Sequence, residues 1–221
     1  MTLLLVFGLL FPSQVPEYSI TCDQAQFENM MENWEQEITI PCTVTHQGII
    51  YENCTMRIRG DTSRAYRKKS YRVEFPPDQP LHGRTTWNFN AEYADRSYMR
   101  AWLFSRVLES MGFPVFRVSH ARLNVNGDYR GLFILLEPVD EAFLSLSGID
   151  PSGNLYKAQV DGACANIHDD VDSVWSLKTG SGTGMNDLIQ LIEDLEYTAP
   201  GNFQAFMDTA FVMEGEYGLL R

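Results

Sequence analysis

The dipeptide Asn126-Gly127 is the feature that most restricts what this chain can fold into. Both central residues of a type I′ turn need a positive φ, which Asn and Gly adopt readily. The flanking residues 117–125 and 129–136 are rich in apolar and β-branched side chains, as strands are. The pattern predicts an antiparallel hairpin, and therefore a domain that contains a sheet.

Three earlier segments also have strand patterns. Residues 49–59 and 69–75 alternate between two kinds of side chain, which predicts two strands. In 49–59 one face is expected to be buried and the other is cationic. The second of these strands ends at Pro76-Pro77. Residues 38–45 form a further candidate strand, and Pro41 places it at the edge of the sheet because proline donates no hydrogen bond.

Helices are predicted on both sides of the hairpin. Asp23 and Gln26 form a capping box that starts one helix, and Asp95 is the expected N-cap of a long helix that ends at Met111 before Gly112. Strands followed by helices indicate the α+β class. The later expectations are a helix over 141–146, mostly loop over 148–184 with a strand at 154–159, and helices around 188–195 and 203–211.

The charge of the chain is uneven. The formal net charge is −12, which argues against binding to nucleic acids or anionic membranes. No Lys or Arg precedes Arg57, whereas residues 57–72 are strongly basic with Asp61 as their one acid. This segment either balances a bound anion or forms a solvated pair of strands.

The N-terminus and the cysteines bear on whether the chain is exported from the cell. The apolar run that ends at Phe11-Pro12 has the length of a signal-peptide core without its basic start, which favours secretion over a misplaced start codon. It is too short to span a bilayer, so no transmembrane span is expected. Among Cys22, Cys42 and Cys54 we expect one disulfide if the chain is exported, and buried thiols otherwise; the spacing fits no zinc site.

Several motifs, taken in order along the chain, resemble the CotH family of atypical kinase-like proteins. They are Arg57-Ile-Arg-Gly-Asp-Thr-Ser-Arg64 with Lys68-Lys-Ser-Tyr-Arg-Val-Glu-Phe75, then Trp87-Asn-Phe-Asn-Ala91 with Asp95, then Leu123 to Glu137 around the hairpin turn, and finally Asn154-Leu-Tyr-Lys157. Together they span roughly residues 15 to 215.

The resemblance implies a protein-kinase-like fold. Residues 38–136 would form an antiparallel-sheet small lobe in which the helix from Asp95 takes the place of the kinase αC helix. Residues 137–221 would form the hinge and an incomplete helical lobe, after a signal-like start and helix in 1–37. Complete members of the family phosphorylate protein serines with ATP and Mg²⁺ or Mn²⁺, so these cofactors are implied here.

The resemblance also suggests nucleotide-binding residues. Lys69 would reach the phosphates, although Lys68 and Arg72 compete for that role because alternation does not say which face meets the cleft. Arg59 with Ser63 would contact phosphate oxygens, or Arg59 would instead pair with Asp61. Glu137 would mark the hinge, although an acid before proline is common in any protein.

The catalytic residues expected of the family are not found. Neither an Asp-containing catalytic loop nor an Asp-x-Asp metal pair is recognisable, and the acidic cluster His168 to Asp172 lies too early and is expected to be a surface turn. We assign no catalytic residue and no metal ligand, and we expect a truncated member that is inactive as given. Its partner would be a protein substrate or a coat or surface protein. The alternative is a non-catalytic interaction or structural protein that is secreted, in the spore coat or at the cell surface.

Overall fold

The computed structural model describes residues 14–158, 171–180, 185–212 and 219–220. It divides into two compact units, which meet in the sequence between Pro138 and Val139.

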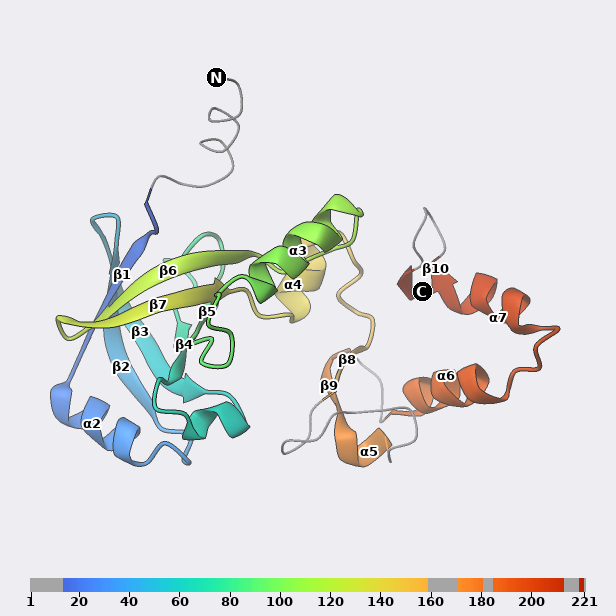
Figure 1. Cartoon of the computed structure of the whole chain (residues 1–221), viewed down its shortest axis with the longest axis horizontal. Helices are drawn as coiled ribbons and strands as arrows, with labels where there is room; N and C mark the ends of the chain where they lie inside the picture. The colour runs from blue at the N-terminus through green and yellow to red at the C-terminus, as the bar shows by residue number, and fades with distance from the viewer. Residues whose placement is uncertain (1–13, 159–170, 181–184, 213–218, 221) are drawn as a thin grey trace, which may run out of the picture. The chain divides into compact units, whose positions relative to one another are not determined.

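A closed barrel of seven strands forms the first unit (Figure 1). The strands follow the order β1-β2-β3-β4-β5-β7-β6, and a parallel pairing of β1 with β6 closes the ring, whereas the other neighbours are antiparallel. The strands are β1 (Glu17–Cys22), β2 (Thr39–His46), β3 (Ile49–Arg59), β4 (Ser70–Glu74), β5 (Thr86–Asn90), β6 (Val118–Val125) and β7 (Asp128–Leu136).

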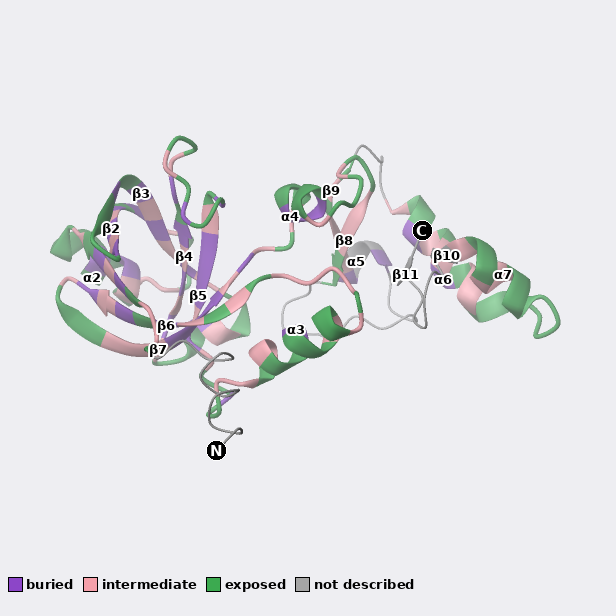
Figure 2. Cartoon of the chain, turned by 90° about the horizontal axis from the view of Figure 1, so that it is seen from above, coloured by how far each residue is buried: buried purple, intermediate pink, exposed green. Residues whose placement is uncertain are grey.

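Alternation along β3 and β4 fills the barrel. Met56 and Ile58 of β3 are buried, as are Tyr71 and Val73 of β4, whereas the residues between them keep part of their surface in solvent. Figure 2 shows the buried residues recurring along the strands. The predicted two-faced strands are confirmed, and the polar face is the one on which Arg59 lies.

The predicted hairpin is also confirmed. β6 and β7 pair antiparallel, and Asn126 (φ 51°) and Gly127 (φ 84°) form the turn between them. The side chain of Asn126 also accepts a hydrogen bond from the main-chain N–H of Cys22 at 2.9 Å. The hairpin turn thereby holds the end of β1 as well as joining its own two strands.

The prediction that β2 is an edge strand is wrong. β1, which the sequence pattern did not reveal, pairs with β2 on the side opposite β3. The β1–β2 ladder ends where Cys22 faces Cys42. Pro41 therefore lies just beyond that ladder, where its missing N–H removes no hydrogen bond to β1.

Helix α2 (Gln24–Glu32) starts as predicted, because the Asp23 carboxylate accepts the N–H of Gln26 at 2.9 Å. The predicted start of the long helix is wrong. Helix α3 (Arg100–Ser110) begins five residues after Asp95. The Asp95 carboxylate instead binds the turn that precedes α3, accepting from the N–H of Ser97 and of Arg100.

Helix α3 leaves apolar side chains in solvent. Ser105 is its buried residue, whereas Leu103, Phe104 and Val107 are exposed (Figure 2). Gly112 follows the helix with a φ of 82°, as predicted for its stop. Part of the apolar surface of α3 is therefore not packed within the first unit.

The second unit contains short elements in addition to the predicted helices. They are α4 (Glu141–Leu146), β8 (Leu155–Ala158), α5 (Val171–Val174), β9 (Trp175–Thr179), α6 (Asn186–Tyr197), α7 (Phe203–Ala210), β10 (Phe211–Val212) and β11 (Leu219–Leu220). β9 pairs with β8, so the prediction that 148–184 is mostly loop is wrong at that strand. Val171, Leu188 and Ile192 form a small core.

These observations confirm the α+β class. A barrel with helices is present, whereas the division into kinase-like lobes stays an expectation from the resemblance. Cys22, Cys42 and Cys54 are free thiols, and the latter two are buried. Most of the acidic cluster 168–172 lies outside the described residues. Within the described part of the chain, no helix is both long and apolar enough to cross a membrane.

Candidate functional site

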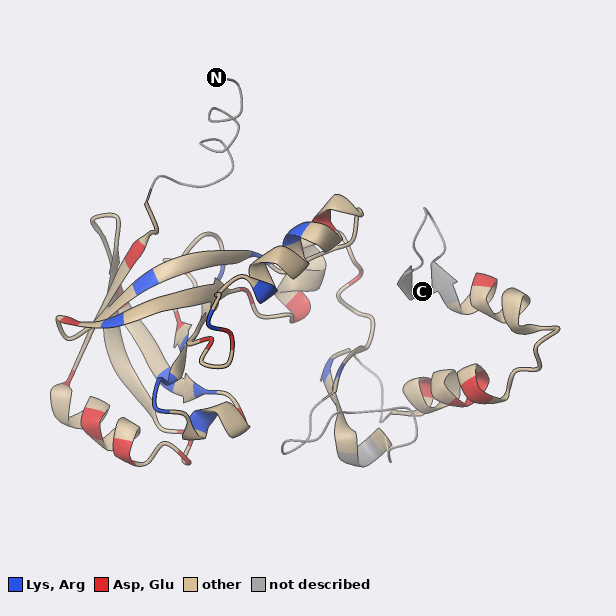
Figure 3. Cartoon of the chain, in the orientation of Figure 1, with Lys and Arg blue, Asp and Glu red and all other residues tan. Residues whose placement is uncertain are grey.

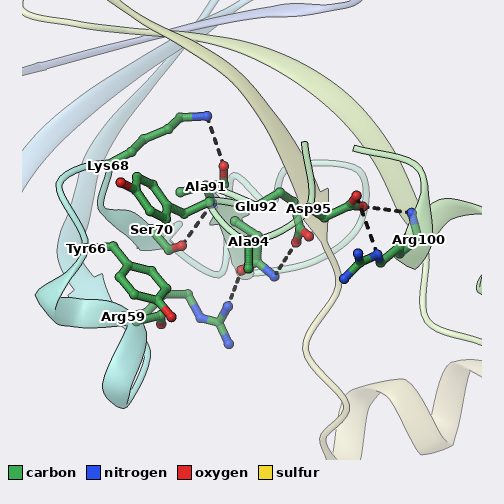
Figure 4. Close-up of a pocket in the computed structure, with 12 residues that line it drawn as sticks. Arg59, Tyr66, Lys68, Ser70, Ala91, Glu92, Ala94, Asp95 and Arg100 are labelled. Atoms are coloured by element: carbon green, nitrogen blue, oxygen red, sulfur yellow. Dashed lines mark hydrogen bonds and ion pairs between the residues drawn. The ribbon is translucent and has the colours of Figure 1, made fainter. Parts of the chain in front are cut away.

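A pocket of about 250 Å³ opens on the polar face of the barrel. It lies between the loop that follows β3 and the segment that joins β5 to α3, as the close-up in Figure 4 shows. Its lining residues are Arg59, Ser63, Tyr66, Lys68, Ser70, Asn90, Ala91, Glu92, Tyr93, Ala94, Asp95 and Arg100.

A tight turn after β3 brings Ser63 to the pocket. Gly60 has a φ of 118°, and a Cβ atom placed there would collide with the Ser63 hydroxyl. A short 3₁₀ helix, η1 (Thr62–Ala65), follows at once. Because only glycine combines this backbone conformation with such a close approach, Gly60 sets the position of Ser63 beside the end of β3.

Arg59 is a half-buried cation in the wall of the pocket. Its Nη1 atom donates to the side-chain oxygen of Asn90, which is a neutral acceptor. The pKa of Arg59 is lowered by burial and then by the nearby positive charges of Arg72 and Arg57. Those two neighbours have ionic partners, because Arg57 pairs with Glu37 and Arg72 with Glu74. Arg59 forms no such ion pair with the residues that the structure describes.

Lys68 is held by a complete set of acceptors. Its ammonium group donates to the main-chain oxygens of Ala91 and Leu132 and to the Tyr98 hydroxyl. It also lies 4.1 Å from the ring centre of Phe133. Burial lowers the pKa of Lys68 to about 8, and the nearby Glu92 partly offsets this effect.

Two carboxylates lie on the other side of the pocket. Glu92 accepts a long hydrogen bond of 3.4 Å from the Asn90 amide. Asp95 accepts from the Ser97 hydroxyl at 2.6 Å and from the Arg100 N–H at 3.0 Å, and it pairs with the Arg100 guanidinium at 3.6 Å. The Ser97 hydroxyl is the largest cause of the lowered pKa of Asp95.

The structure brings together three of the residues that the sequence singled out, namely Arg59, Ser63 and Lys68. Lys69 points elsewhere: its ammonium donates to the main-chain oxygen of Arg64 and lies 4.6 Å from the ring centre of Trp34.

Glu137 also lies outside the pocket. It is buried at the end of β7, where its carboxylate meets Arg117 at 2.8 Å and Arg84 at 3.5 Å. Its main-chain N–H donates to the Arg117 oxygen. Both the carboxylate and the N–H of Glu137 therefore already have partners within the barrel.

Sequence reasoning did not name several pocket residues. Asn90, Glu92, Tyr93 and Arg100 all line the pocket, and Asp95 was interpreted only as a helix cap. The available signal was the Trp87-to-Ala91 motif with Asp95 shortly after it. This motif marked the resemblance, but it was treated as structural.

A comparison of the sequence with models of protein families matches one family. The family model described as CotH kinase protein matches residues 56–211, which is more than half of the chain. The chain belongs to this family. The CotH match starts in β3 and ends at the first residue of β10, and thus includes all the lining residues of the pocket.

One curated relative adds a similarity over part of the chain. The inner spore coat protein H of Bacillus subtilis (strain 168) is 30% identical to this CotH chain over 114 residues. The aligned region is 52% of this chain and 31% of that protein. The chain therefore spans about a third of the length of the relative that it matches.

Proposed function

We propose that the pocket beside Arg59 binds the phosphate groups of ATP, as part of an atypical protein kinase of the CotH family that phosphorylates protein serines. The observation that carries the proposal is the Arg59 guanidinium in the wall of the pocket. Arg59 is largely withdrawn from water and has a neutral amide oxygen as its hydrogen-bond partner. Glu92 acts on this guanidinium without forming an ion pair with it, and a phosphate oxygen would supply a negative charge at hydrogen-bond distance.

The remaining groups suit the same ligand. The Ser63 hydroxyl can donate to phosphate, and the exposed Arg100 guanidinium lies at the opposite wall. The pocket volume of about 250 Å³ is below the roughly 300 to 1,000 Å³ of sites that enclose a drug-sized ligand. This size favours binding of the phosphate groups, with the nucleoside outside the pocket.

The other residues that the resemblance suggested take lesser parts in this proposal. Lys68 contributes positive charge at the pocket wall, because its donors are already directed at Ala91, Tyr98 and Leu132. Glu137 fixes the end of β7 through its arginine partners. Lys69 belongs to a neighbouring cavity.

The described residues do not fit the divalent metal that the family implies. No group of three or more His, Cys, Asp or Glu side chains converges anywhere in the described part of the chain. Both oxygens of Asp95 already accept hydrogen bonds, which leaves Glu92 as the one pocket carboxylate with a weak partner. No step of the proposed reaction is therefore assigned to a metal held by these residues.

The test is calorimetric titration of ATP into the wild-type chain, Arg59→Gln and Arg57→Gln. Arg57 lies two residues away on the same strand and pairs with Glu37 outside the pocket, so it is a matched control for the loss of one positive charge. Removing a hydrogen bond to a charged group costs about 1.5 to 3 kcal/mol, so we expect Arg59→Gln to weaken ATP binding roughly tenfold or more. Arg57→Gln should bind like the wild type.

Equal ATP affinity of all three proteins would contradict the proposal. Transfer of the terminal phosphate of ATP to a serine protein, measured with Mg²⁺ and with Mn²⁺, tests the catalytic part separately. Absence of ATP binding in the wild type would favour the second candidate, a non-catalytic coat or surface interaction protein, which the name of the spore coat relative supports.

A further inference from the structure

A second cavity of about 280 Å³ also has Lys68 in its lining but differs in composition from the first. Four cationic side chains line it, and no Asp or Glu does: Arg67, Lys68, Lys69 and Arg130. Its walls also include Met31 and Phe133. Figure 3 shows basic residues on the segment between η1 and β4 and on the hairpin strands, from which these cations come.

One donor in this cavity has no acceptor. The Nε atom of Arg130 is buried and makes no hydrogen bond within the described structure. The same guanidinium pairs with Asp128 at 3.4 Å, but that carboxylate is 76% exposed. A buried N–H without a partner costs roughly 1 to 3 kcal/mol, so a ligand oxygen at this atom would remove an existing penalty.

Two further side chains of this cavity, Tyr71 and Arg67, have a weak hydrogen-bond partner or none among the described residues. The Tyr71 hydroxyl donates to the sulfur of Met31 at 3.6 Å, and a thioether is a weak acceptor. Arg67 is exposed and forms no ion pair or side-chain hydrogen bond with any residue that the structure describes. Burial raises the pKa of the Tyr71 hydroxyl, and the nearby positive charge of Arg130 partly offsets this increase.

We propose that this second cavity binds a phosphate monoester, with its oxygens at Arg130 Nε and the Tyr71 hydroxyl and its charge balanced by Arg67 and Lys69. A dianion suits the site better than a carboxylate, since four cations face it without an acid among the lining residues. The apolar walls at Met31 and Phe133 favour a phosphate that carries an organic group. The ligand is therefore either a phosphorylated side chain of a protein or a small phosphate ester.

The two cavities share Lys68 and Tyr93 but otherwise differ. The test must therefore separate this site from the proposed ATP site. The probes are O-phosphoserine, a short phosphoserine peptide, the same peptide without phosphate, and inorganic phosphate. Tighter binding of the phosphopeptide than of O-phosphoserine would identify a protein side chain as the source, and equal binding would identify a small ester.

Each probe is titrated into the full chain and into Arg67→Gln, Arg130→Gln, Tyr71→Phe and Arg106→Gln. Arg106 is exposed on α3 and pairs with Glu109, so it controls for the loss of one charge. We expect Arg130→Gln to weaken binding of O-phosphoserine about tenfold and Arg67→Gln about threefold, since an exposed charge contributes less. Arg106→Gln should have no effect.

The Nε–H resonance of Arg130 gives a direct readout in the wild type. It should shift downfield when O-phosphoserine binds, because the proton gains an acceptor. Arg67→Gln removes no side-chain hydrogen bond or ion pair to any residue that the structure describes, so it keeps the test valid if Arg130→Gln does not fold. Unchanged affinity in Arg67→Gln and no shift at Arg130 would overturn the proposal.

Arg59→Gln distinguishes the two proposals. Loss of O-phosphoserine binding in Arg59→Gln, but not in Arg67→Gln or Arg130→Gln, would place the phosphate in the first pocket and refute the second site. Retained O-phosphoserine binding with lost ATP binding in Arg59→Gln would support both sites.

Discussion

The Nζ atom of Lys68 lies 3.0 Å from the main-chain oxygen of Ala91. This hydrogen bond joins the segment just before β4 to the residue directly after β5, and the same ammonium also donates to Leu132 of β7. One lysine thus connects three segments of the barrel and lines both cavities. Its position makes Lys68 structurally important whether or not it contacts a ligand.

The first prediction concerns the pH dependence that Lys68 contributes to stability. Its pKa in the folded chain is about 8, below the usual 10.5. Between these values the unfolded chain binds more protons at this residue, so the Lys68 contribution to the unfolding free energy should rise with pH. The slope for one proton is at most ~1.4 kcal/mol per pH unit.

Urea unfolding between pH 7 and 10.5 measures this slope. Lys68→Met should lose it, whereas Lys157→Met, an exposed lysine of the second unit, should keep it. The comparison uses slopes, because Lys68→Met also removes hydrogen bonds at every pH. Parallel pH profiles of wild type and Lys68→Met would refute the prediction.

The second prediction concerns the buried ion pairs of Glu137. Its side chain and that of Arg84 are each 3% exposed, so Glu137→Gln removes a buried negative charge that lies against two guanidinium groups, those of Arg84 and Arg117. Removing one partner of a buried pair typically destabilises a protein by about 3 to 5 kcal/mol. Denaturant unfolding of the first unit should show a loss of this size.

The exposed pair of Arg106 and Glu109 provides the control. Glu109→Gln should change the unfolding free energy by less than about 1 kcal/mol. A similar effect of the two substitutions would show that the Glu137 cluster is not a stabilising element of the barrel.

The third prediction concerns thiol reactivity. Burial raises the pKa of Cys54 to about 11 and also raises the pKa of Cys42. At pH 8 a thiol with a pKa near 11 is ionised at roughly one part in a thousand, and the thiolate is the reactive form. Iodoacetamide should therefore label Cys54 and Cys42 slowly in the folded chain and rapidly in urea, as mass spectrometry would show. Fast labelling of Cys54 in the native chain would contradict its burial.

The fourth prediction concerns Gly131 in β7. Its φ is 106°, and an added Cβ would lie 3.8 Å from the Cε and Nζ atoms of Lys68. An alanine Cβ would make only an ordinary van der Waals contact there, but residues other than glycine rarely adopt this φ. Gly131→Ala should therefore destabilise the barrel by about 1 to 3 kcal/mol. Gly201→Ala, where no atom lies within 4 Å, should be close to neutral. Equal midpoints of thermal unfolding for the two variants would refute this expectation.

Local patterns in the sequence predicted much of the barrel. The turn at Asn126-Gly127, the alternation along β3 and β4, and the cap at Asp23 were all predicted and are all present. Each depends on residues close together in the chain, where the preferred φ, the period of a strand or a single side-chain hydrogen bond is decisive.

Only the tertiary structure determined how the strands close into a barrel and which charged side chains lie beside one another. β1 pairs with both β2 and β6, and the second pairing joins Tyr18 to Leu123, a relation that no local period contains. Asp95 was a plausible cap by type, but the chain uses its carboxylate in the turn before α3.

The same dependence on long-range contacts explains why the sequence could not tell which of Lys68 and Lys69 lines the first pocket. Alternation predicted that the neighbours Lys68 and Lys69 point to opposite sides of the chain, but it could not assign either side to the pocket, and both residues precede β4 in the structure. Closure of the barrel directed Lys69 to Trp34 and Lys68 to Ala91. The sequence determined the two faces, and only the packing of distant strands determined which of them meets Arg59, because that choice depends on long-range contacts.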